Sequence, residues 1–391
     1  MRRRNFAGAA LLPLALAACA TVPEVATPTP DLPQAFFFAP EATTGAALAA
    51  LMPQSDPAYA TLSQAALAEG PSLAEALARI DAATAQAQGV RLALLAEIAA
   101  SVTDWRVLDA RAAAIEADAA AARQLAALAK VREDAGIAPG FDRIRAEANA
   151  SASATRLAAL DSERARLTGR LVTLTGQDAA AVRAALAAPA PALAPASAPA
   201  ALPSDLLANR PDVAVAAANL AASDADLAAA ARARFPRITL SGVIGLLAFD
   251  PGALFDDSVV GSLTGGIAGP LLDFGRVAAQ IDAAAADKRA AFAAYRGAVY
   301  QALGDAEAAY GVVTAADAEA SLAVTQRDQL TRAAQIAETR YRAGLASFLE
   351  VLEARRAADS SGENAAAALG RAARARIVLW QALGGEAVAA D

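Results

Sequence analysis

Two long stretches of the chain repeat their apolar positions at intervals of three and four residues, with polar residues between them. The first repeats them at Ile98, Val102, Trp105, Ala112, Ile115, Ala119 and Ala122, with one interval of seven. The second repeats them at Phe292, Tyr295, Val299, Ala302, Ala306, Ala309 and Val313. This spacing is typical of a coiled-coil seam, in which small alanine side chains let helices approach closely. The pattern therefore predicts a mainly α-helical protein, and the seam alone indicates core packing.

The two stretches belong to an internal repeat. Residues 92–136 align with residues 300–344 at an offset of 208, without a gap, and each copy ends at a glycine. Each copy predicts a long helix, a glycine turn and a second helix. Prolines punctuate the chain before the first copy and between the two, where a helix cannot continue. The expected organisation is a signal peptide (1–18), a tether (19–55), a first helical repeat (56–176), an Ala/Pro linker (177–203), a second helical repeat (204–385) and a tail (386–391).

The second repeat contains a segment of another kind. After Pro236 the residues become rich in β-formers and glycine, and a loop at 250–257 divides them. We expect strands at 237–249 and 258–272, each long enough to cross a bilayer at a tilt. Because the alternation of polar and apolar residues is imperfect, a soluble hairpin packed on helices is the alternative.

The N-terminus has the parts of a secretion signal: three arginines, a short apolar run and small residues before Cys19. Residues 16–19, Leu-Ala-Ala-Cys, resemble the bacterial lipobox, which implies cleavage before Cys19 and attachment of lipid, including palmitate, to it. Several acyl chains anchor a protein stably. The alternative is a cysteine that lies in a signal peptide by chance. Ala20 follows, and the rule for lipoproteins then implies forwarding to the outer membrane.

Composition excludes several classes of function. Hydrophobic residues make up 56% of the 391 residues but aromatic residues only 5%, so alanine accounts for much of the apolar content. The net charge of -7 argues against a nucleic-acid partner. The chain has no histidine, one cysteine and no glycine-rich phosphate loop after a strand, so we expect no catalytic residues, no metal site and no cofactor besides the lipid on Cys19. An envelope enzyme would need a polar cleft that the sequence does not indicate.

Four segments together resemble the TolC-type outer-membrane efflux family, in its lipoprotein branch. They are LPSDLLANRPDV at 202–213, ARARFPRITL at 231–240, GPLLDFGR at 269–276 and RYRAGLASFLEVLEA at 340–354, and their order matches the family over most of residues 50–385. The resemblance implies a homo-oligomer, a trimer, that crosses the outer membrane as a β-barrel and the periplasm as an α-helical tunnel. A periplasmic adaptor protein and an inner-membrane pump would be its partners. The implied function is the passive exit duct of a tripartite exporter for small molecules.

The resemblance also implies roles for the two turns, at Gly136 and Gly344. Each glycine is explained by helix capping alone. The resemblance places the periplasmic tip and gate there, at Tyr341, Asp142, Gly136, Gly344 and Ser347. It places an acidic pore ring at Glu350 and Glu353. Without the resemblance, these two glutamates indicate only a solvent-exposed helix face. The family's gate arginine is replaced by Ala346, although Arg340 and Arg342 lie nearby.

The first repeat departs from the family pattern. Residues 56–87 resemble the family's opening helix but run straight into the helix at Leu92, so the first hairpin is expected to be missing. A trimer would then own six strands instead of twelve, and even an eight-stranded barrel is filled by its side chains. The alternative function is therefore a non-conducting periplasmic coiled-coil scaffold lipoprotein derived from the same family.

The lipobox resemblance generates the first testable prediction. Cys19→Ser removes the sulfur that would carry lipid, so acyl labelling should be abolished and the precursor should stay unprocessed. Metabolic labelling with a fatty acid and the mobility of the precursor measure this. Unchanged processing and membrane fractionation in the variant would contradict lipidation.

Overall fold

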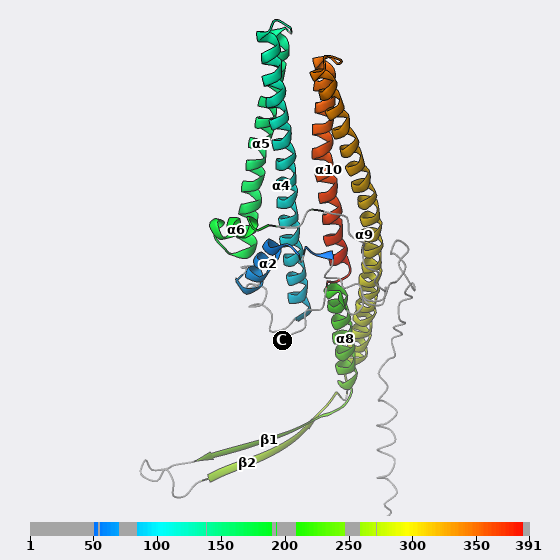
Figure 1. Cartoon of the computed structure of the whole chain (residues 1–391). Coiled ribbons are helices and arrows are strands. Elements are labelled where there is room, and N and C mark those ends of the chain that lie inside the picture. Colours follow the sequence, from blue (N-terminus) through cyan, green and yellow to red (C-terminus); the bar gives the residue numbers. More distant parts are fainter. Residues whose placement is uncertain are drawn as a thin grey trace, which may run out of the picture. The chain divides into compact units, whose positions relative to one another are not determined.

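A computed structural model describes residues 51–53, 55–69, 84–137, 139–189, 193, 209–246, 259–270 and 272–385. These residues are mostly helical, with one two-stranded sheet, as predicted. Cys19, the tail and all of the tether before residue 51 lie outside the described residues. The described residues form two compact units: a smaller one within 216–297, and a larger one from the described residues before 216 and after 297. The elements, shown in Figure 1, are α2 (Pro57–Glu69), α4 (Thr84–Asp134), α5 (Gly140–Thr175), α6 (Ala179–Leu186), α8 (Pro211–Arg232), β1 (Arg237–Leu246), β2 (Val259–Ala268), α9 (Arg276–Arg342) and α10 (Phe348–Ala382).

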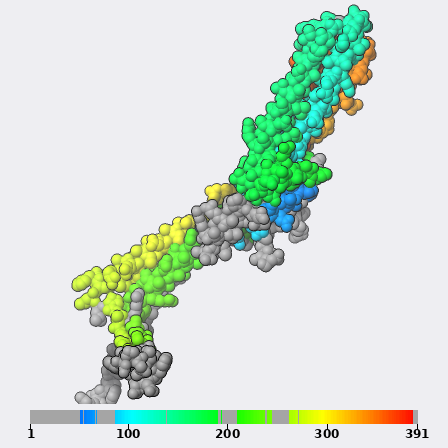
Figure 2. Space-filling model, turned by 90° about the vertical axis from the view of Figure 1, so that its left-hand side faces the viewer, coloured from blue at the N-terminus to red at the C-terminus, as the bar shows by residue number. Residues whose placement is uncertain are grey.

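The larger unit consists of long helices packed along alanine-rich seams. Helices α4 and α5 form a hairpin, and α10 packs against the other side of α4 (Figure 1). Figure 2 shows α5 running alongside α4 over its length. Most of the predicted seam positions are buried, which confirms the helical periodicity in both repeats. Fully or almost fully buried among them are Ile98, Val102, Ala112, Ile115, Ala119, Ala122, Val299, Ala302, Ala306, Ala309 and Val313.

Ion pairs flank these seams. Arg164 of α5 donates to Asp109 of α4 at 2.9 Å, and Arg376 of α10 donates to Asp317 of α9 at 2.8 Å. Arg374 of α10 pairs with a carboxylate of α4. Because interhelical pairs of this kind fix partner and orientation more than they stabilise, they help to set which helices lie together.

A buried ion pair fastens the N-terminal end of the first repeat. Asp56 caps α2 by accepting from the backbone N–H of Ala58 at 2.9 Å, and it also accepts from Arg106 of α4 at 2.8 and 3.0 Å. Arg106 donates further to the carbonyls of Leu186 and Ala188 at 2.8 and 3.1 Å. The two charged side chains are only 5% and 12% exposed, so removal of either would leave an uncompensated buried charge.

Helix α6 corrects the predicted linker. The segment 177–203 was expected to be an Ala/Pro linker, but residues 179–186 form a helix that buries Val182 and Leu186. Asp178 accepts from the backbone N–H of Ala181 at 2.8 Å and caps its first turn. Figure 2 shows α6 beside α2, and the two helices are in contact. The prolines that break helices begin only at Pro189, after α6 has ended.

The smaller unit combines helix and sheet. Leu227 of α8 packs against Val277, Ile281 and Ala285 of α9, and Lys288 pairs with Asp224 at 2.6 Å. Helix α8 is long and apolar enough to cross a membrane, judged by length and composition alone. Within the structure, 11% of its most apolar window is buried. Its apolar character comes from alanine, and its ion pair to α9 fits a helix packed on a neighbour.

The hairpin has two chemically different faces, which its register reveals. Strands β1 and β2 pair antiparallel, with Leu240 opposite Gly265 and Gly242 opposite Leu263. Directly opposed residues share a face, and faces alternate along a strand. One face therefore carries Leu240, Gly242, Leu263, Gly265 and Ile267, and the other carries Thr239, Ser241, Val243, Ser262, Thr264, Gly266 and Ala268. Apolar on one side and hydroxyl-rich on the other is the alternation of a membrane strand.

The first strand begins at Arg237 as predicted, and the second ends earlier than predicted. Strand β1 is described as far as Leu246, and 247–249 lie outside the described residues, whereas β2 ends at Ala268 before the predicted 272. Pro270 lacks the N–H that a ladder needs. Gly269 packs against Pro236, where an added Cβ would lie 2.9 Å from the Cα. These residues close the base of the hairpin and stop the pairing.

The missing first hairpin stays a prediction. Residues 70–83, between α2 and α4, lie outside the described residues. The ranges described in the first repeat are helical on both sides of that segment, with α2 ending at Glu69 and α4 beginning at Thr84.

The register generates the second prediction. Leu263 is 76% exposed at the middle of the apolar face, and Thr264 is its neighbour on the hydroxyl face. If the apolar face meets lipid, Leu263→Arg should cost about 2–4 kcal/mol of folding free energy in a bilayer. Thr264→Arg, with the same charge in the same strand, should cost far less. Urea titration of both variants in phosphatidylcholine vesicles measures the difference, and equal losses would contradict a lipid-facing hairpin.

Candidate functional site at the two glycine turns

The turns that end α4 and α9 have the same backbone geometry. Gly136 and Gly344 adopt φ angles of 68° and 75°, the left-handed region that favours glycine. The backbone N–H of Ile137 donates to the carbonyl of Arg132 at 2.8 Å, and that of Leu345 donates to the carbonyl of Arg340 at 2.8 Å. Both turns therefore close with the same helix C-terminal motif, and helix capping explains both glycines.

Tyr341 lies in a core that joins the two repeats just below the turns. Its side chain is 3% exposed and packs edge-on against Phe348, with ring centroids 5.9 Å apart. The guanidinium of Arg132, from the first repeat, lies 4.6 Å from the centre of the Tyr341 ring. Arg132 also donates to the Tyr341 carbonyl at 3.2 Å. The surrounding core contains Leu125, Ala129, Ala146, Val351 and Leu352.

Asp142 acts on Tyr341 through charge. It lies in the first turn of α5, half-buried. Burial raises the pKa of the Tyr341 hydroxyl, and the charge of Asp142 raises it further, whereas Arg132 opposes the shift. The Tyr341 hydroxyl is buried without a hydrogen-bond partner. The structure thus brings Tyr341 and Asp142 to the same end of the unit, with Arg132 of the first repeat beside Tyr341.

Ser347 and Glu350 cap α10. The backbone N–H of Ser347 donates to Glu350 Oε2 at 2.8 Å, and the N–H of Glu350 donates to Ser347 Oγ at 3.2 Å. This is a capping box, which satisfies donors at a helix start. The hydrogen bond from Ser347 lowers the pKa of the exposed Glu350 carboxyl. Glu353 is also exposed, one turn further along α10. The two carboxylates are close, but Glu350 is held at the turn by the cap.

Two residues of this site escaped the sequence analysis. Phe348 supplies the aromatic partner of Tyr341, and Arg132 supplies the cation over its ring. The alignment of the repeats held a signal for Arg132, because it matches Arg340, the equivalent arginine before the second turn. In the second repeat Arg340 instead donates to the carbonyl of Leu345, at 3.4 Å.

Charged networks flank the core on both sides. Arg143 of α5 donates to Glu133 at 2.7 Å and to Glu147 at 2.9 Å. Glu338 of α9 pairs with both Arg342 and Arg355. Ala346 stands at the position where the resemblance places a gate arginine. Other arginines nevertheless form ion pairs with carboxylates at both turns.

Apolar side chains are exposed at both turns. The large hydrophobic residues that are exposed there are Val131, Ile137, Phe141, Ile144, Leu345 and Leu349. Exposed apolar residues clustered in this way mark a contact surface. Over the described residues, no group of three metal-ligating side chains lies together.

The sequence is similar to those of known outer-membrane proteins. Residues 202–385 match the model of the outer membrane efflux protein family. The pyoverdine export outer membrane protein OpmQ of Pseudomonas putida is 29% identical over 310 residues, which are 79% of this chain and 66% of that protein. Nodulation protein T of Rhizobium leguminosarum bv. trifolii is 28% identical over 314 residues, 78% of this chain and 66% of that protein. The chain thus spans 66% of the length of these two relatives.

Solved structures share the fold. The outer-membrane channel OprN superposes with a TM-score of 0.77 at 24% identity, covering 94% of this chain and 99% of that one. The Neisseria gonorrhoeae MtrE outer membrane channel, in its open state, superposes with a TM-score of 0.76 at 20% identity, covering 94% of this chain and 98% of that one. Residues 202–385 are thus similar to the outer membrane efflux protein family, and the chain shares the fold of these outer-membrane channels.

Proposed function

We propose that this protein is the outer-membrane component of a tripartite exporter and serves as a passive duct for small molecules. The observation that carries the proposal is the combination, in one chain, of a two-faced hairpin with two helical repeats that end in matching turns. The hairpin suits a bilayer, and long helices suit a tunnel across the periplasm. The names of the relatives, which include pyoverdine and toluene export, support small molecules as cargo.

The duct requires several copies of the chain. A two-stranded hairpin is marginally stable alone, and within lipid its unpaired edges must be satisfied by neighbouring strands. Helix α9 also leaves Val312, Leu322 and Ile336 more than half exposed. We propose a homotrimer in which neighbouring copies cover these side chains and close the sheet edges.

The exposed apolar side chains at the turns are the proposed contact surface for the periplasmic adaptor protein, which links the duct to an inner-membrane pump. The anchor is the proposed lipid on Cys19. In this arrangement the hairpin end lies in the outer membrane and the turns point into the periplasm.

The gate is proposed at Tyr341 and Asp142, with Arg132 as a third member. Arg132 is bound to Tyr341 across the two repeats, so it would hold their ends together when the duct is closed. Glu350 and Glu353, repeated in each copy, would form an acidic ring that favours cations.

The gate generates the third prediction. Tyr341→Ala combined with Asp142→Ala removes the aromatic contact and the charge beside it, so conductance in planar bilayers should rise several-fold. Leu345→Ala, a truncation at the same turn of a side chain that is 70% exposed, is the matched control and should leave conductance unchanged.

A scaffold predicts a different result. If correctly assembled wild-type and gate-variant oligomers both stay electrically silent, the duct is wrong and the non-conducting scaffold lipoprotein is favoured.

The acidic ring generates the fourth prediction. Glu350→Gln with Glu353→Gln removes both charges while glutamine can still complete the capping box, so assembly should be retained. The reversal potential in a salt gradient should move toward that of an unselective pore. Glu319→Gln, on α9 and paired with Arg371, is the control. An unchanged cation preference in the double variant would remove these residues from the selectivity site.

A further inference from the structure

Two carboxyl groups meet across the interface between the repeats. Asp118 of α4 and Asp359 of α10 lie opposite each other in the antiparallel register that also places Gly362 against Ala114 and Arg374 against Asp104. The Asp359 residue is 5% exposed. Asp118 Oδ2 and Asp359 Oδ1 are buried, and neither accepts a hydrogen bond. The pair lies about 24 Å from the end of α4, because Asp118 precedes that end by sixteen residues at about 1.5 Å each.

A hydrogen bond between two carboxyl groups needs a proton, because an ionised carboxylate only accepts. When two carboxylates share a buried site, one of them holds its proton above the ordinary range. Burial, the hydrogen bond to Asp359 and the charge of Asp359 raise the pKa of Asp118 to about 8.

The surrounding cations are engaged elsewhere. Arg156 of α5 donates to Glu363 at 2.6 Å, and Glu363 also lies 3.6 Å from Arg111 of α4. Arg355 of α10 pairs with Glu338 of α9. Arg156 and Arg355 lower the pKa of Asp118, but less than the other effects raise it. The acid pair therefore depends on its own proton.

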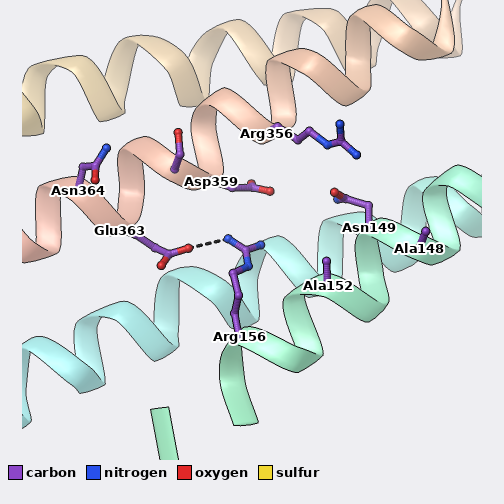
Figure 3. Close-up of a pocket in the computed structure, with 9 residues that line it drawn as sticks. Ala148, Asn149, Ala152, Arg156, Arg356, Asp359, Glu363 and Asn364 are labelled. Atoms are coloured by element: carbon purple, nitrogen blue, oxygen red, sulfur yellow. Dashed lines mark hydrogen bonds and ion pairs between the residues drawn. The ribbon is translucent and has the colours of Figure 1, made fainter. Parts of the chain in front are cut away.

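Solvent can reach the pair. A cavity of about 390 Å³ opens between α5 and α10, and Asp359 is among its lining residues, together with Arg356 and Asn149. Figure 3 shows the Asp359 carboxylate directed into the space between the two helices, while Arg156 binds Glu363. Protons can thus exchange without unfolding of the helices.

We propose that Asp118 and Asp359 form a proton-operated latch between the two helical repeats. With one proton shared, the pair holds α4 against α10. When the proton is lost, two buried negative charges face each other and push the helices apart. The latch rests on contacts within one chain and does not depend on the proposed transport function.

The direction of the pH effect follows from linkage. The latched state binds a proton more tightly than separated carboxyls do, so its advantage is complete below their ordinary pKa, near 4. The advantage falls as pH rises and is lost above about 8. Across that window the ratio of latched to separated helices should fall by up to about tenfold per pH unit.

Pulsed electron paramagnetic resonance on the full-length oligomer tests the latch. Spin labels on cysteines at Ala113 of α4 and Asn364 of α10, two exposed positions one to two turns from the pair, report the distance between the helices. Labelled chains are diluted with unlabelled ones so that distances within a chain dominate. Between about pH 5 and pH 9 the wild-type distance should lengthen or broaden reversibly.

Two matched variants decide the cause. Asp118→Asn supplies a permanent N–H donor to Asp359, so its distance should stay short at both pH values. Asp104→Asn removes another carboxylate of α4, one that faces Arg374 of α10, and should keep the wild-type response. A wild-type distance that does not change with pH, or an Asp118→Asn variant that changes as the wild type does, would overturn the latch.

Discussion

The packing of α4 against α10 is the contact on which the helical unit depends, because it joins the two repeats. Small residues at this contact let the two helices approach each other closely. A Cβ added at Gly370 would lie 2.3 Å from Val107 Cγ2, and one added at Gly362 would lie 3.7 Å from the Cβ of Ala114. Close approach matters here because each alanine of the seam buries little apolar area. The stability of the contact therefore depends on many dispersion contacts between closely packed atoms instead of on large buried side chains.

A seam of small side chains gives unusual weight to the polar groups within it. Each alanine position contributes little, so the charged groups between the helices determine much of which residues lie opposite each other at that level. Asp104 with Arg374 and Asp118 with Asp359 lie at successive levels of the same antiparallel contact. The first pair joins opposite charges, whereas the second brings two carboxyl groups together and is the proposed latch.

Local patterns predicted the helices, the glycine turns and the starts of the strands, because those features depend on spacing and on backbone preference. The two faces of the hairpin were not predicted, because glycines interrupt the alternation of apolar and polar residues along each strand. The apolar face becomes evident only from the strand pairing, in which Leu263 lies opposite Gly242. Helix α6 was missed although Asp178 and the buried Val182 and Leu186 carried its signal, because the prolines that follow dominated the segment. The contact of Arg132 with Tyr341 joins residues far apart in sequence, and no local pattern encodes such a distance.

The closure of the two turns has a mechanical consequence. At each turn the last carbonyls of the helix are satisfied by backbone N–H groups of the same chain, and a capping box satisfies the donors at the start of α10. The last turns of α4 and α9 and the start of α10 therefore complete these backbone hydrogen bonds without a neighbouring helix. A relative movement of the two turns would therefore leave their backbone–backbone hydrogen bonds in place, and the bond from Arg132 to the Tyr341 carbonyl would be among the contacts that it exchanges.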